Sequence, residues 1–291
     1  MAALSDIKRK IVAVDKTRQI TKAMNAVAAS KFKFAQQKME NFRPYASKFM
    51  EALNSLALRV DSSSHPLLAV REPKRIKIIC MTSDRGLCGG FNTNTIRATG
   101  RFVKEKVDEG KEVSLIAVGK KGRDSLRKKL NVVAGYTDVF GKIDMSLSAK
   151  IGEDVIPSFI AEEYDELYLI FNEFFNVTIQ RPMVVRLLPL PSVGKEMEVE
   201  PEKKVDYIYE PSEEVLLERL LPMYLRVLIY RALLETSAGE NGARMAAMDN
   251  ATNNCDEMID TLTLKYNKAR QSAITAELMD IVGGTEALAA G

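Results

Sequence analysis

Apolar side chains recur every three or four residues at both ends of the chain, and this spacing predicts a long helix at each end. In the first helix the apolar positions begin with Leu4, Ile7, Ile11 and Val14 and resume at Phe42, Ala46, Phe49, Leu53, Leu56 and Val60. No glycine occurs in the first 60 residues. Pro44 is expected to bend or break this helix near Arg43, because proline has no amide hydrogen for the helical ladder.

Short apolar runs and helical stretches alternate in the middle of the chain. Strands are expected at 76–82, at VSLIAVG and at 132–136, with helices over 93–109, 120–130 and 146–163. Two more strands, YDELYLIFN and VTIQRPMVVRLLPL, close the region, and Pro182 is expected to interrupt the second one. Their short connection predicts an antiparallel pair. The alternation predicts an α/β fold, a Rossmann-like sheet covered by helices.

A second long helix is expected from Ser212 to Leu288. Ser212, followed by Glu213 and Glu214, is a suitable helix start. One stripe of side chains keeps three-four spacing over four heptads, which is the period of a coiled coil. This C-terminal seam consists of Met245, Met248, Thr252, Cys255, Ile259, Leu262, Tyr266, Ala269 and Ala273.

The lengths of the two helices favour a rod. At about 1.5 Å per residue the second helix extends on the order of 110 Å and the first about 85 Å, whereas a 150-residue domain is only about 40 Å across. The two helices are expected to form an antiparallel coiled coil with the α/β domain inserted between them. The predicted segments are a helix at 1–60, the α/β domain at 74–192, a connector and foot at 193–211, and a helix at 212–288.

A rod of two helices buries one seam only. Apolar side chains beyond that seam should therefore stay exposed and need a further partner. They are Ile274, Leu278, Ile281 and Leu288. This pattern predicts an interaction protein.

Composition and charge exclude several classes of protein. Of 291 residues, 46% are hydrophobic and 28% charged, with a mean hydropathy of −0.12, which is too apolar for a disordered chain. No stretch approaches the roughly 18 apolar residues of a membrane helix. A net charge of +3 is far from the excess of a bulk nucleic-acid binder. Residues 1–60 carry 12 basic and 4 acidic side chains and residues 212–291 carry 7 and 12, which favours pairing of the two ends.

The residues that could carry chemistry form no catalytic or metal-binding set. Gly86, Gly89 and Gly90 lie between a strand and a helix, where phosphate cradles occur, but the segment lacks both GxxxxGK[ST] and GxGxxG. A structural turn is favoured over a nucleotide site. Three cysteines and one histidine cannot form a four-ligand zinc site with ordinary spacing. Cys88 is the only candidate for a reactive thiol, and His65 is expected in an exposed loop. No cofactor or metal is expected.

Two terminal segments and two internal ones carry a family resemblance. ITKAMNAVAASKFKFA at 20–35 and ARMAAM with KARQSAITAEL near the end resemble the gamma subunits of F-type ATP synthases, and TSDRGLCGGFN and VDYIYEPSEEVL match the same family. The resemblance spans essentially the whole chain. It implies a noncatalytic rotor shaft, in one copy, inside a ring of three alpha and three beta subunits. Ion flow through a membrane ring of c subunits would turn the shaft.

The resemblance also implies contacts with the catalytic head. Arg270, Gln271 and Thr275 match positions where the last helix hydrogen-bonds loops of the head, and Arg244 is similarly placed. Met24 matches a position that faces the moving arm of the beta subunits. The alternatives are a solvated polar face for the four residues of the last helix and seam packing for Met24.

Further contacts are implied at the opposite end. Tyr209 and Glu210 in DYIYEP match the foot that rests on the membrane ring. The outer face of the α/β domain is expected to bind the epsilon subunit. The start MAALSDIKRK lacks the apolar core of an export signal, so an intracellular protein is expected. With no transit peptide, the resemblance implies a peripheral position on the cytoplasmic face of a bacterial membrane. Two other interpretations stay open, a nucleotide-using α/β enzyme with helical appendages and a static coiled-coil scaffold. Nucleic acid is not expected as a partner.

Overall fold

The computed structural model describes residues 2–57, 65–141, 143–190 and 212–289. Its contacts group the chain into two units, one comprising residues up to Val27 and from Met245 onward, the other Ala28–Arg244. The helices α1 (Ala2–Ala57) and α5 (Glu213–Ala289) contribute to both units. The four predicted segments stay a prediction, and the predicted foot lies outside the described residues.

The unit Ala28–Arg244 contains a five-stranded sheet in the order β3-β2-β1-β4-β5. Its strands are β1 (Arg75–Met81), β2 (Glu112–Val118), β3 (Val132–Tyr136), β4 (Glu166–Phe174) and β5 (Gln180–Leu188). The first four are parallel, and β5 runs antiparallel to β4. The predicted strands and the predicted antiparallel pair are confirmed.

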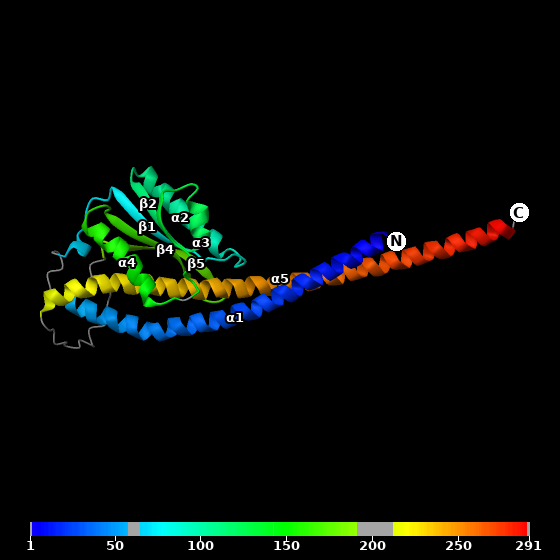
Figure 1. Ribbon diagram of the computed structural model, residues 1–291, viewed down its shortest axis with the longest axis horizontal. Helices are drawn as coiled ribbons and strands as arrows, with labels where there is room; N and C mark the ends of the chain where they lie inside the picture. The colour runs from blue at the N-terminus through cyan, green and yellow to red at the C-terminus, as the bar shows by residue number, and fades with distance from the viewer. Residues whose placement is uncertain (1, 58–64, 142, 191–211, 290–291) are drawn as a thin grey trace. The chain divides into compact units, whose positions relative to one another are not determined.

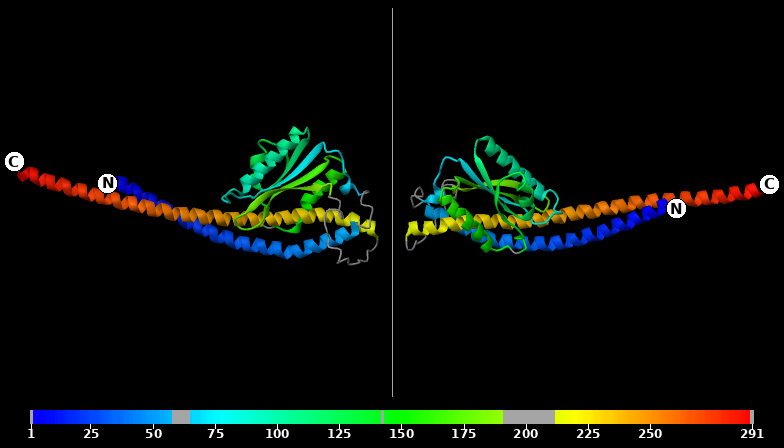
Figure 2. Two further views of the ribbon diagram at one scale, coloured as in Figure 1. Left: turned by 180° about the vertical axis from the view of Figure 1, so that it is seen from behind. Right: turned by 45° about the horizontal axis from the view of Figure 1, so that its top comes forward.

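Helices cover both faces of the sheet (Figure 1). On one face α2 (Phe91–Asp108) and α3 (Lys120–Leu126) pack on side chains such as Ile76 and Ile78. The alternate side chains Ile79 and Met81 belong to the core of the other face. There α4 (Met145–Ile160) and the part of α5 that contains Leu217 and Leu234 cover the sheet, as both views of Figure 2 show. This alternation along β1 is the period of two that a pleated strand imposes.

Within this unit α5 is buried all round from Ala232 to Gly242. The sheet covers one side of this segment, and α1 packs near it through Phe42, whose ring meets Tyr230 edge-on at 4.8 Å. A helix enclosed on all sides needs small residues where backbones and rings approach. Gly239 meets that need, because a Cβ there would lie 2.9 Å from the Phe91 ring.

Two prolines do not interrupt the elements that contain them. Helix α1 continues through Pro44, so the predicted break near Arg43 is wrong. The loss of one hydrogen bond there is offset by packing of the flanking turns, for example Phe42 on Tyr230 and Leu53 in the core. Strand β5 also continues through Pro182, opposite Asn172. It is an edge strand, where a missing amide hydrogen can face away from the ladder.

In the other unit, α1 and α5 lie side by side and run antiparallel. Their contacts pair rising residue numbers in α1 with falling numbers in α5, from Arg18 with Asp256 to Thr21 with Thr252. Every residue of the C-terminal seam is buried or half-buried, whereas the residues between them on the outer face are exposed. The predicted exposure of Ile274, Leu278 and Ile281 is confirmed, whereas the side chain of Leu288 lies outside the described residues.

The approach of α5 to the ring of Phe91 leads to a test of stability. Gly239→Ala should lower the free energy of unfolding by about 1–3 kcal/mol, because the added methyl group forces the buried ring to shift. The control is Gly100→Ala in α2, where nothing lies within 4 Å of the new Cβ, and it should stabilise by about 0.5–1 kcal/mol. Chemical denaturation of both variants measures the difference. Equal effects of the two substitutions would contradict the close approach.

Candidate functional site

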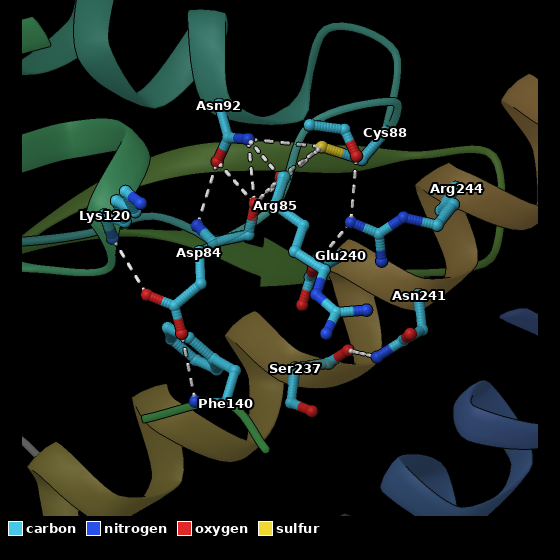
Figure 3. Close-up of polar contacts among 12 residues, drawn as sticks. Asp84, Arg85, Cys88, Asn92, Lys120, Phe140, Ser237, Glu240, Asn241 and Arg244 are labelled. Atoms are coloured by element: carbon cyan, nitrogen blue, oxygen red, sulfur yellow. Dashed lines mark hydrogen bonds and ion pairs between the residues drawn. The ribbon is translucent and has the colours of Figure 1, made fainter. Parts of the chain in front are cut away.

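The segment between β1 and α2, residues 83–90, forms a tight turn held by its own polar side chains (Figure 3). We call it the glycine turn. Ser83 and Asn92 bond each other, and Asn92 Nδ2 donates to the carbonyl oxygen of Arg85 at 3.3 Å. Gly89 has a φ of 56°, in the left-handed region that glycine adopts readily. Leu87 has a φ of 63° although a residue with a side chain rarely adopts this region. Strain of this kind persists where the surroundings fix the backbone.

Asp84 ties the glycine turn to the neighbouring strand ends. Its Oδ1 accepts hydrogen bonds from the amides of Lys120 and Asp138, each at 2.9 Å, and its Oδ2 accepts one from Phe140 at 3.3 Å. The carboxylate therefore closes the carboxyl edge of the parallel strands, where α/β proteins often bind ligands. This use of Asp84 is structural.

The glycine turn is also bonded to α5, through an arginine. Arg244 Nη2 donates to the carbonyl oxygen of Gly86 at 3.1 Å and to Glu240 Oε1 at 2.6 Å, as Figure 3 shows. The side chain of Arg244 is only 12% exposed and that of Glu240 only 7%. Burial raises the pKa of Glu240, and the positive charge of Arg244 opposes that rise. One donor nitrogen thus connects a buried carboxylate with the backbone of the turn.

The cysteines of this unit are packed and poorly reactive. Cys88, the one candidate for a reactive thiol, is 2% exposed, and burial raises the pKa of its thiol. Cys80 is fully buried in β1, and burial raises its pKa to about 11. Only the thiolate is a nucleophile, so both thiols should react slowly.

His65 has a structural use that the sequence did not suggest. Its Nδ1 accepts a hydrogen bond from the amide of Leu67 at 3.1 Å and so caps a short 3-10 helix, Pro66–Leu68. Burial lowers the pKa of this imidazole. The residue is half-buried, whereas we expected an exposed loop.

Two amides at the ends of the glycine turn already have partners within the chain. The Phe91 amide at the start of α2 bonds Cys88, and that of Ser83 bonds Asn92. Among the residues that the structure describes, no three His, Cys, Asp or Glu side chains gather as metal ligands. No described helix has an apolar stretch of the length that crosses a bilayer.

Polar side chains join α1 and α5 in the unit that holds the chain ends. Arg18 Nη1 lies 3.0 Å from Asp256 Oδ1, and the hydroxyl groups of Thr21 and Thr252 are 2.8 Å apart. Asn25 Nδ2 donates to Asp249 Oδ1 at 3.3 Å. The sequence analysis missed these pairs, although the opposite charges of the two ends were a signal for them.

The residues predicted to meet the catalytic head lie in different settings. Arg270, Gln271 and Thr275 are exposed on α5, and the only hydrogen bond described among them runs from Thr275 Oγ1 to the Gln271 carbonyl at 3.0 Å. Met24 is half-buried on the face of α1 that also carries Thr21.

The other predicted partner-binding residues are Arg244 and the pair Tyr209 and Glu210. Arg244 belongs to the unit of the glycine turn and not to that of the chain ends. Tyr209 and Glu210 lie outside the described residues. The sequence analysis did not find Glu240, although its spacing of four residues from Arg244 on a helix favours an ion pair.

Comparison with known proteins identifies similar chains over the full length. A family model described as ATP synthase matches residues 3–288. The ATP synthase gamma chain of Syntrophus aciditrophicus is 68% identical over 291 residues, covering all of both chains. That of Maridesulfovibrio salexigens is 52% identical over 290 residues, covering 99% of each chain.

Chains in solved structures also resemble this chain. A chain of the central stalk and c-ring of Tetrahymena thermophila mitochondrial ATP synthase is 28% identical, with a TM-score of 0.61, covering 80% of this chain and 99% of that one. A chain of Euglena gracilis mitochondrial ATP synthase, at 20% identity and a TM-score of 0.71, covers 100% of this chain and 96% of its own length, and shows the same fold.

The settings of the three thiols lead to a labelling test. In the folded chain at pH 8, iodoacetamide should modify the half-buried Cys255 at least about ten times faster than Cys88 or Cys80, because burial and a raised pKa suppress the two thiolates. Mass spectrometry of the peptides measures the three rates. Cys255→Ser should remove nearly all fast labelling. Modification of Cys88 as fast as that of Cys255 would show that the turn is open in solution.

Proposed function

The chain belongs to the gamma-chain family of ATP synthase, and from that premise we propose that it is the noncatalytic rotor of the complex. In this proposal α1 and α5 form an antiparallel coiled coil that occupies the axis of a head of three alpha and three beta subunits. Rotation of the coil couples ion flow through a ring of c subunits to ATP synthesis or hydrolysis. The observation that carries the proposal is the end of α5, where apolar side chains stay exposed.

This exposure supports an enclosing partner. From Ile274 to Val282, five large apolar side chains on α5 are 50–68% exposed: Ile274, Leu278, Met279, Ile281 and Val282. They lie on more than one side of the helix, because a helix turns by about 100° per residue. No described part of the chain covers them. A sleeve formed by several subunits would bury such a helix end, whereas one flat partner would not.

Coupling by rotation requires a shaft that touches each catalytic subunit differently. A ligand or partner shifts an equilibrium only by its differential contact with the two states. An asymmetric pair of helices of unequal length, 56 and 77 residues, presents a different face to each of three subunits. Turning the pair would exchange their nucleotide affinities, and by linkage changes in nucleotide occupancy would turn the pair.

We assign the head contacts to Met24, Arg270, Gln271 and Thr275. The three residues of α5 support this role by their exposure. Met24 is half-buried beside α5, so seam packing remains its alternative.

The remaining partners follow from the family. Tyr209 and Glu210 are proposed to rest on the membrane ring, and the α/β sheet unit is proposed to bind the epsilon subunit. The assembly would be peripheral on the cytoplasmic face of a bacterial membrane.

The two rival functions differ from the rotor in testable ways. A nucleotide-using enzyme needs a ligand at the glycine turn, which lacks both GxxxxGK[ST] and GxGxxG. Gly89→Ala should then abolish ligand binding, whereas the rotor proposal expects only a folding defect at a φ of 56°. A static scaffold shares the helix pair and lacks the motion.

Replacement of an exposed arginine separates partner binding from folding. Arg270→Ala should leave the free energy of unfolding of the isolated chain within about 0.5 kcal/mol of the parent. ATP-driven ion pumping, or assembly with the head, should fall by about ten-fold or more, because a hydrogen bond to a charged group contributes roughly 1.5–3 kcal/mol. Lys268→Ala, at another exposed position of α5, is the control and should change neither. An equal loss of stability in the isolated Arg270 variant would contradict this role.

The composition of the native complex tests the proposal as a whole. Purification from gently stripped membranes should yield one copy of this chain with a head of three alpha and three beta subunits, as measured by native mass spectrometry. Recovery of the chain alone with stoichiometric tightly bound ATP would support the enzyme interpretation and contradict the rotor.

A further inference from the structure

Arg244 is engaged within its own chain, although the family resemblance places it among residues that face the head. Its Nη2 donates to both Gly86 and Glu240, and its side chain is 12% exposed. Both hydrogens of Nη2 are used within the chain, and the burial of the side chain limits its access to another subunit. The residue that it reaches, Gly86, is 158 positions away in the sequence.

The two acceptors differ in kind, and together they fix the guanidinium. Glu240 is one helical turn before Arg244 on α5 and supplies a buried charge at 2.6 Å. Loss of either member would leave the other buried and unpaired, which is costly. The carbonyl oxygen of Gly86 belongs to a different element, so the same nitrogen joins α5 to the glycine turn.

The backbone of the glycine turn requires a restraint such as the hydrogen bond from Arg244. Leu87 holds a left-handed φ of 63° and the residue is 63% exposed, so packing of its side chain contributes little to holding the conformation. Arg85 is exposed beside it, whereas Cys88 is buried on the inner side. The bond at Gly86 lies immediately before Leu87. It therefore restrains the backbone at the strained position.

We propose that Arg244 is a positioning residue, which with Glu240 fastens the glycine turn to α5 and so presents Arg85 and Leu87 outward in a fixed geometry. Its effect on coupling would be indirect, through the turn, and not through contact with the catalytic head. This inference rests on the proposed function only for its effect on coupling. The fastening itself is a property of the isolated chain.

The alkylation rate of Cys88 measures whether the glycine turn is held against α5. In the full chain with Cys255→Ser, Arg244→Ala should raise the rate of Cys88 alkylation at least about ten-fold, because the turn then opens away from α5. Glu240→Ala should raise it to a similar extent, and the double variant should add little more. Arg244→Lys, which keeps the charge and one donor nitrogen, should restore part of the protection of Cys88 from alkylation. Arg219→Ala, at an exposed arginine of the same helix, should have no effect.

Labelling of Cys80 distinguishes local opening of the turn from global unfolding. It is fully buried in β1, so a local opening of the turn leaves it unmodified, whereas global unfolding exposes both thiols. Faster labelling of Cys88 with Cys80 still protected supports the proposal. Unchanged labelling of Cys88 in Arg244→Ala, or a parallel rise at both cysteines, would overturn it. If Arg244→Ala does not fold, Glu240→Ala, which removes the acceptor and keeps Arg244, provides the comparison.

The assembled complex supplies the second measurement. Arg244→Ala and Glu240→Ala should each lower ATP-driven ion pumping per ATP hydrolysed by a similar factor, and the double variant by no more than either alone. A direct contact of Arg244 with the head predicts instead that Glu240→Ala has little effect, and this outcome would overturn the inference. Failure of the chain to join any head would count against the proposed function and leave the labelling result unaffected.

Discussion

The burial of α5 between the sheet and α1 is the interaction on which residues 28–244 depend. Over Ala232–Gly242 the helix exposes almost nothing, so its polar side chains must find partners inside the protein. Glu235 pairs with Arg231 and accepts from the amide of Phe174, and Glu240 pairs with Arg244. These bonds fix both the rotation and the position of α5 on the sheet. The residues that follow Arg244 in the same helix belong to the unit of the chain ends.

The two units of the chain are held together by different interactions. In Ala28–Arg244 the helices are held by apolar cores on both faces of a sheet. In the unit of the chain ends, the described contacts between α1 and α5 include hydrogen bonds and an ion pair at Arg18, Thr21 and Asn25, while Val12, Ile20 and Val27 are 49–60% exposed. Apolar side chains thus occur both in the seam between the two helices and on their outer faces. The exposed apolar side chains suit a pair of helices that is itself surrounded by protein.

Much of this fold could be predicted from the sequence, because strands such as IKIICM and helices with three-four spacing carry their periods locally. The C-terminal seam was predicted for the same reason. The two prolines were misjudged, since local propensity cannot include the packing of Phe42 on Tyr230 or the edge position of β5. The bond from Arg244 to Gly86 could not be predicted, because its partners meet only once the sheet and α5 are assembled. The partner-facing residues came from the family resemblance alone.

The central claim, that the chain turns inside the catalytic head, is tested most directly by a reversible cross-link. Glu257 is exposed on α5, and a cysteine there, in a Cys255→Ser background, can be oxidised to a cysteine introduced on a facing loop of a beta subunit in the assembled enzyme. The account predicts that ATP hydrolysis stops in proportion to disulfide formation and returns on reduction. Full hydrolysis with the cross-link complete would contradict rotation and leave the chain a static scaffold.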